Sequence, residues 1–94
     1  MASIGINKEV IKKACELLIA EVGKEVVEND RLVVEMDTTG GRNIYVGISP
    51  EHQKVRTGLL RMAKAQTILN LCDFANDYIE INDDDYNLLY KHLN

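Results

Sequence analysis

The chain has 94 residues, 46% of them hydrophobic and 28% charged, which predicts one globular domain over 1–94 and excludes two separately cored units. Its 11 basic and 15 acidic residues give a formal net charge of −4, which excludes a generally basic nucleic-acid-binding protein. No apolar run reaches the ~20 residues of a transmembrane helix and no signal-peptide pattern opens the chain, so we expect a cytoplasmic protein whose two cysteines are buried free thiols.

The first predicted element is an amphipathic helix over residues 7–22. Asn7 is a suitable N-cap, and Gly23 is a suitable stop because glycine tolerates the left-handed conformation that ends many helices. Apolar residues recur at i, i+4, i+7 and i+11, namely Ile11, Cys15, Leu18 and Val22. This spacing is typical of one buried helical face.

A β-hairpin is predicted next. Residues 24–30 fit either more helix or a short edge strand, and we expect the strand. Apolar and polar residues then alternate over 31–37 and again over 43–48, as in two half-buried strands. Between them, Gly40 and Gly41 suit the positive φ angles of a hairpin loop. The sequence therefore predicts two or three antiparallel strands.

A long helix is predicted over residues 50–76. Ser49 as N-cap, Pro50 at the first helical position and Glu51 in the first turn favour this start. Gly58 inside the helix indicates either a bend or a close approach to a neighbour. The helix has two apolar stripes, and a domain this small has one core, so we expect a homodimer or higher homo-oligomer. The predicted oligomer-interface residues are Leu60, Leu71, Phe74 and Tyr78.

The chain closes with a short strand over 78–81 and a helix over 83–93. Three consecutive carboxylates, Asp83, Asp84 and Asp85, precede the apolar residues of that helix. Three acids can attract a cation, but the glycine and the glutamate of a calcium loop are missing. We therefore expect Asp83 to be the N-cap, with the acids favoured by the helix dipole, and no metal site.

No catalytic motif is present. Residues 37–41 contain the glycines of a phosphate-binding loop but lack the lysine and the helix start, so a hairpin loop is the better interpretation. His52 and His92 have no nucleophile at a recognised spacing, and His52 is expected to be a surface residue of the long helix. We predict a protein that is not an enzyme and carries no cofactor.

Charge is unevenly distributed along the chain. Residues 1–40 carry −3, residues 41–64 carry +4 and residues 65–94 carry −5. The basic middle segment supplies the predicted partner-binding residues: Arg42, Lys54, Arg61 and Lys64. It suits either an acidic protein surface or phosphates, or else it is a solvated helix face or pairs with the acidic C-terminal segment.

These features predict an α+β fold in the order helix, antiparallel hairpin, long helix, short strand, helix, with the helices on one face of the sheet. The predicted function is a small non-enzymatic binding or regulatory protein that acts through protein–protein contacts as a homo-oligomer. The alternative is a nucleic-acid-binding accessory factor that uses the basic patch. An enzyme ranks third, and its site would have to form across a subunit interface.

Overall fold

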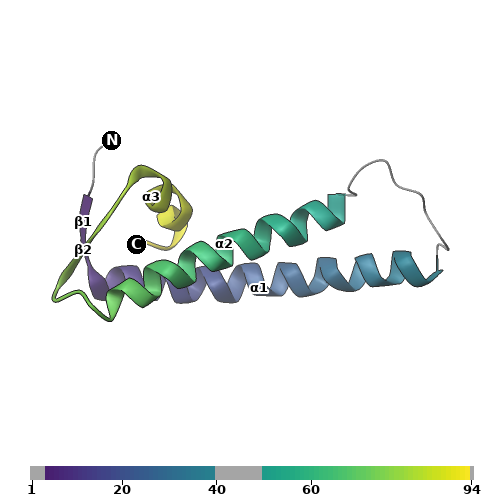
Figure 1. Cartoon of the computed structure of the whole chain (residues 1–94), viewed down its shortest axis with the longest axis horizontal. Helices are drawn as coiled ribbons and strands as arrows, with labels where there is room; N and C mark the ends of the chain where they lie inside the picture. The colour runs from purple at the N-terminus through teal and green to yellow at the C-terminus, as the bar shows by residue number, and fades with distance from the viewer. Residues whose placement is uncertain (1–3, 40–49, 94) are drawn as a thin grey trace.

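The computed structural model describes residues 4–39 and 50–93. Two long helices, α1 (Lys8–Thr39) and α2 (Pro50–Cys72), run side by side as an antiparallel hairpin (Figure 1). The short strands β1 (Ile4–Asn7) and β2 (Tyr78–Ile81), helix α3 (Asp83–Leu89) and the 3-10 turn η1 (Tyr90–His92) gather at one end. The radius of gyration is 16.7 Å, against about 12 Å for a compact chain of this length, so the molecule is elongated.

The sheet consists of β1 and β2, which pair antiparallel with Ile6 opposite Ile79 and Asn7 opposite Tyr78. The α+β class is therefore confirmed in broad terms, as is the strand over 78–81. Strand β1 was not predicted, because the alternation of apolar and polar residues over its four positions is too short to be distinguished from chance. Packing of all helices on one face of the sheet stays a prediction.

The predicted strands over 24–30 and 31–37 are wrong, since α1 continues as helix to Thr39. The stripe of its first half extends through Val22, Val26, Asn29 and Val33, which are buried or half-buried. This i, i+4, i+7, i+11 spacing keeps one helical face against α2, and packing outweighs the strand preference of valine. The loop from Gly40 and the strand over 43–48 lie outside the described residues.

Gly23 does not end α1, and a Cβ added there would lie 3.6 Å from Cε of Met62, an ordinary packing distance. The predicted N-cap is confirmed, because Asn7 Oδ1 accepts a hydrogen bond of 2.8 Å from the Glu9 backbone N–H. The predicted start of α2 at Pro50 is also confirmed, but α2 ends at Cys72, four residues before the expected end.

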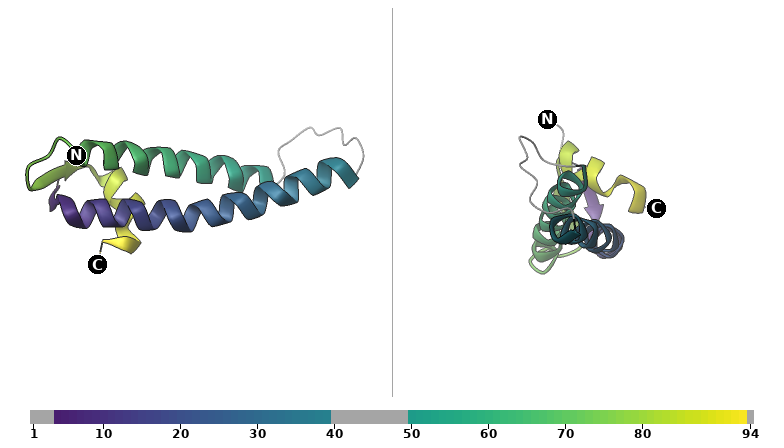
Figure 2. Two further views of the ribbon diagram at one scale, coloured as in Figure 1. Left: turned by 90° about the horizontal axis from the view of Figure 1, so that it is seen from below. Right: turned by 90° about the vertical axis from the view of Figure 1, so that its right-hand side faces the viewer.

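One hydrophobic core joins the two long helices to the end cap. Its fully buried side chains include Ile11, Cys15 and Leu18 of α1 and Leu89 of α3, and the buried residues Ala65, Ile68 and Cys72 of α2 and Ile79 and Ile81 of β2 also belong to it. α3 lies against one side of the hairpin, and Figure 2 shows it behind the paired helices. Beyond the reach of α3, the hairpin continues as a two-helix arm.

The final helix is present as predicted, but its N-cap is Asn82 and not Asp83. Asn82 Oδ1 accepts a hydrogen bond of 2.8 Å from the Asp85 backbone N–H, and the three aspartates occupy the first turn. Asparagine and aspartate cap equally well, so the backbone and not the residue type decides which one serves. His92 Nε2 lies 3.2 Å from Glu21 Oε2 and ties the C-terminal turn to α1.

Candidate protein-binding site

The predicted basic residues form a strip along one side of α2. Lys54, Arg61 and Lys64 are spaced by seven and three residues, which places them on one side of a helix. We call these three residues the basic strip. The fourth predicted residue, Arg42, lies outside the described residues. The strip runs beside two adjacent surface hollows, and Arg61 and Thr57 line both.

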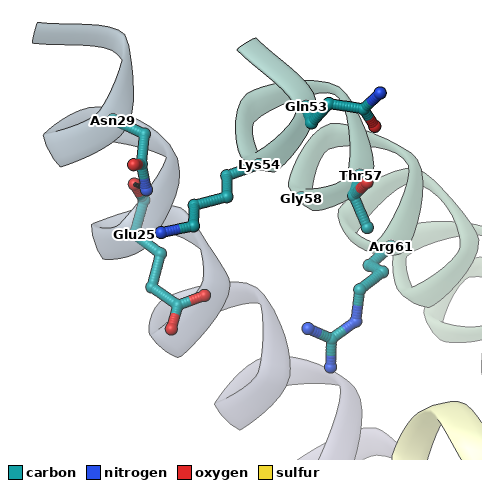
Figure 3. Close-up of a pocket in the computed structure, with 7 residues that line it drawn as sticks. All are labelled: Glu25, Asn29, Gln53, Lys54, Thr57, Gly58 and Arg61. Carbon is teal, nitrogen blue, oxygen red and sulfur yellow. Dashed lines mark hydrogen bonds between the residues drawn. The ribbon is translucent and has the colours of Figure 1, made fainter. Parts of the chain in front are cut away.

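The first hollow lies between α1 and α2 and has a volume of about 340 Å³. Figure 3 shows Lys54 and Arg61 reaching from α2 toward α1, where Glu25 and Asn29 form the facing wall. The Asn29 side chain donates a hydrogen bond of 2.8 Å to the Glu25 carbonyl, which fixes its amide on the helix. Gln53, Thr57 and Gly58 complete the lining.

The second hollow, of about 540 Å³, lies between α2 and α3. Leu60, Arg61 and Lys64 line it from α2, and Asp84 and Leu88 line it from α3, together with Thr57 and Asn87. Asp84 therefore lies in α3 opposite the strip, as expected if the basic segment faces the acidic C-terminal segment. The linings of both hollows are mainly polar or amphipathic, which suits a hydrogen-bonding ligand surface.

The basic strip makes no ion pair within the part of the chain that the structure describes. Among residues 4–39 and 50–93, no salt bridge within 4.0 Å joins Lys54, Arg61 or Lys64 to a carboxylate. An ion pair forms elsewhere, between Arg31 and Glu28, and His92 contacts Glu21. Glu25 and Asp84 thus border the strip without pairing with it, and its cations can take an external carboxylate.

Sequence reasoning missed the polar residues that complete the first hollow. Glu25 and Asn29 belong to a segment predicted as strand, so nothing placed them beside α2. Gln53 and Thr57 adjoin the basic positions, and a search for polar residues flanking Lys54 and Arg61 would have found them.

The predicted oligomer-interface residues are all exposed, but they are spread widely. Leu60 and Leu71 lie on α2, Phe74 lies in the turn after it and Tyr78 in β2, with exposed fractions of 52% to 87%. Leu60 and Leu71 are eleven residues apart, about 16 Å along a helix. Leu60 also borders the second hollow.

The reactive side chains are not arranged for catalysis. Burial raises the pKa of the Cys15 thiol from 9.0 to about 12 and raises that of Cys72 as well, so both are protonated at neutral pH and are poor nucleophiles. Within the described residues, no three histidine, cysteine or acidic side chains are grouped to hold a metal ion. No described helix combines the length and apolar character needed to cross a membrane.

Comparison of the chain with protein families, curated proteins and solved structures found no match.

Proposed function

We propose that this protein is a small non-enzymatic binding or regulatory protein of the cytoplasm, which holds an acidic surface of another protein on its basic strip. The observation that supports this most is the row of Lys54, Arg61 and Lys64, which borders two hollows and has no ion pair within the described chain. Arg61 and Lys64 lie three residues apart, the spacing of neighbours on a helix surface, where like charges repel each other. A partner carboxylate relieves this repulsion.

An acidic protein fits the site better than a nucleic acid. The strip supplies three positive charges, and Glu25 and Asp84 border it, so a long phosphate backbone would meet carboxylates on both sides. None of the residues that line the two hollows is aromatic, whereas single-strand binding uses aromatic stacking platforms. A protein partner can instead place one or two carboxylates between these acids and donate hydrogen bonds to them.

The test is capture of partners by the immobilised chain and by a variant with all three strip residues changed to glutamate. We expect the variant to lose a host protein that the parent retains, because reversing charges at an interface slows association. The matched control reverses three exposed lysines away from the strip, with the same change in net charge: Lys12, Lys13 and Lys91. This control should retain the partner.

Two outcomes would overturn the proposal. In the first, the strip variant retains every partner of the parent, which makes the strip an ordinary solvated face. In the second, the parent binds duplex or single-stranded nucleic acid with an affinity that falls steeply with salt, and the strip variant loses that binding. This second outcome would favour the nucleic-acid-binding alternative.

Self-association is part of the proposal. The outward stripe of Leu60, Leu71, Phe74 and Tyr78 supports it, since four large apolar side chains lie exposed along α2 and the segment that follows. A face on the other side of the hairpin offers a second place for the contact.

A further inference from the structure

The side of the helical hairpin opposite the two hollows is apolar. Val27 is two residues from both Glu25 and Asn29, and Leu59 is two residues from both Thr57 and Arg61. At about 100° per residue, two steps turn a side chain by about 200°, to the opposite side of its helix. Val27 is 70% exposed and Leu59 52% exposed. We call this side the open face: it comprises Ile19, Ala20, Gly23 and Val27 of α1 and Val55, Leu59 and Met62 of α2.

The open face is continuous across both helices. Met62 of α2 lies beside Gly23 of α1, and Gly23 lines a shallow hollow with Ile19, Ala20 and Val27, which Lys24 and Glu28 also line. Figure 2 (left) shows α1 and α2 side by side in a view from below, with α3 behind them. The face therefore places two small residues, Ala20 and Gly23, among larger apolar side chains, a surface against which other helices can pack closely.

The arm of the hairpin has no core of its own. Within residues 23–33 and 50–61, Gly58 is the only buried residue, whereas Val26, Val33 and Val55 are half-buried. Two helices bury too little apolar surface to stabilise each other without a further layer. The hollows on the α3 side are polar, so the missing layer belongs on the open face.

Charges at the edge of the open face identify a second copy of the chain as that layer. Three of the four basic residues of α2 form the basic strip on the opposite side, so Arg56 is the remaining cation of α2, and Glu28 is an acid of α1 that lines the hollow of the open face. A two-fold axis parallel to the helices stacks each α1 on the α2 of the other copy and so brings this acid to this cation. An axis across the helices would stack α1 on α1 and α2 on α2.

The same symmetry fixes which residues meet. Val26 and Gly58 lie at the same height along the hairpin. Because α1 and α2 run antiparallel, Glu28, two residues after Val26, lies at the height of Arg56, two residues before Gly58. A two-fold axis parallel to the helices leaves heights unchanged, so Glu28 of one copy lies at the height of Arg56 of the second copy. Both side chains are exposed. Around the helix axis, Glu28 lies about 100° beyond Val27 and Arg56 lies about 60° beyond Leu59, in each case away from the neighbouring helix of the same copy. The two charges therefore flank the apolar contact on the same side, although Glu28 also pairs with Arg31.

The open face is the apolar centre of a larger contact. Its residues span about 12 Å of helix length, and two helices side by side are about 20 Å wide. The ~800 Å² per partner of a standard interface takes about 40 Å of length at that width, so the contact extends along both helices into the polar residues on either side, within the 53 Å length of the molecule. We propose that the protein dimerises through the open face as an antiparallel four-helix bundle in which Glu28 pairs with Arg56 of the second copy. This inference rests on the proposed self-association and moves its contact from the outward stripe to the open face.

The test is sedimentation equilibrium of the full chain over the micromolar range. We expect a dimer of twice the 10.6 kDa chain mass, and monomers for V27E and L59Q with unchanged helical circular dichroism. Reversing one charge, E28R or R56E, should weaken dimerisation about tenfold. The combined variant E28R/R56E should restore it, which a general loss of stability would not allow.

The matched controls change the outward stripe. L71S and F74S remove comparable exposed apolar groups and should leave the dimer intact. A monomeric parent would overturn the inference, as would a dimer that survives V27E, or one that E28R weakens and the charge swap does not rescue. If F74S alone disrupts the dimer, the outward stripe is the contact. Each of these variants retains the basic strip, so partner capture reports separately on the proposed function.

Discussion

Replacing Gly58 by alanine should destabilise the protein, although alanine is the better helix former. Gly58 is a buried residue of α2 that faces α1, and a Cβ there would overlap Cγ2 of Val26 and lie 3.3 Å from Cγ1 of Val22. Both neighbours are β-branched, and valine in a helix has one strongly preferred rotamer. Neither side chain can rotate away, so the helices must separate.

The size of this effect follows from two opposing terms. Alanine gains about 1 kcal/mol over glycine in a helix interior, whereas an extra methyl group in a packed contact costs about 1–3 kcal/mol. The stiffness of Val26 and Val22 favours the upper part of that range, so we expect a net loss of about 1–2 kcal/mol in the free energy of unfolding. For a domain of this size each 1 kcal/mol lowers the melting temperature by about 4–8 °C.

Thermal and denaturant unfolding of G58A provide the measurement, with G23A as the matched control. Gly23 is also inside a helix, but its added Cβ meets only the flexible end of Met62 at 3.6 Å, so G23A should gain up to about 1 kcal/mol. Measurements at several protein concentrations separate this gain from self-association. A G58A variant as stable as the parent would contradict the predicted clash with Val26. So would a V26A substitution that fails to relieve the loss of stability caused by G58A.

Three further predictions concern the end cap and the core. N82A should cost about 1 kcal/mol in denaturant unfolding because it removes the bond to the Asp85 N–H, while D83A should change stability little; a larger loss in D83A would contradict the assigned cap. L89A should cost about 2–5 kcal/mol, since Leu89 is fully buried, and a loss below this range would mean that α3 docks loosely. Burial raises the pKa of the Cys15 thiol from 9.0 to about 12, so the free energy of unfolding should fall as pH rises from 9 to 12; an equal fall in C15A would show that other groups cause it.

The elements set by local signals were predicted from the sequence, and those that depend on distant contacts were not. Asn7 and Pro50 mark helix starts through capping and backbone geometry, which act within a turn. Gly23 has the residue type of a helix stop, but α1 continues because Met62 and the apolar stripe hold it against α2. The alternation of apolar and polar residues over 31–37 is compatible with a strand as well as with a helix. The helix forms because α2 is long enough to pack against this part of α1.

The candidate site shows the same division. The spacing of Lys54, Arg61 and Lys64 predicted one side of a helix, and the structure places these residues along two hollows. The facing residues Glu25 and Asp84 come from elements far away in the sequence. Their positions depend on the pairing of α1 with α2 and the docking of α3, which charge counts along the chain do not reveal.

The two proposed surfaces lie on opposite sides of the hairpin, and this has a consequence for binding. The basic strip borders the hollow between α2 and α3, whereas the open face lies about 200° around each helix from the residues that line the hollows. A dimer formed through the open face would therefore carry two strips on its outer surfaces, facing in opposite directions. Such a dimer can bridge two acidic partners, and a partner that is itself multivalent would be held more tightly than one strip allows. V27E should then reduce the retention of a multivalent partner and leave binding to a single strip unchanged, whereas reversal of the strip should remove both.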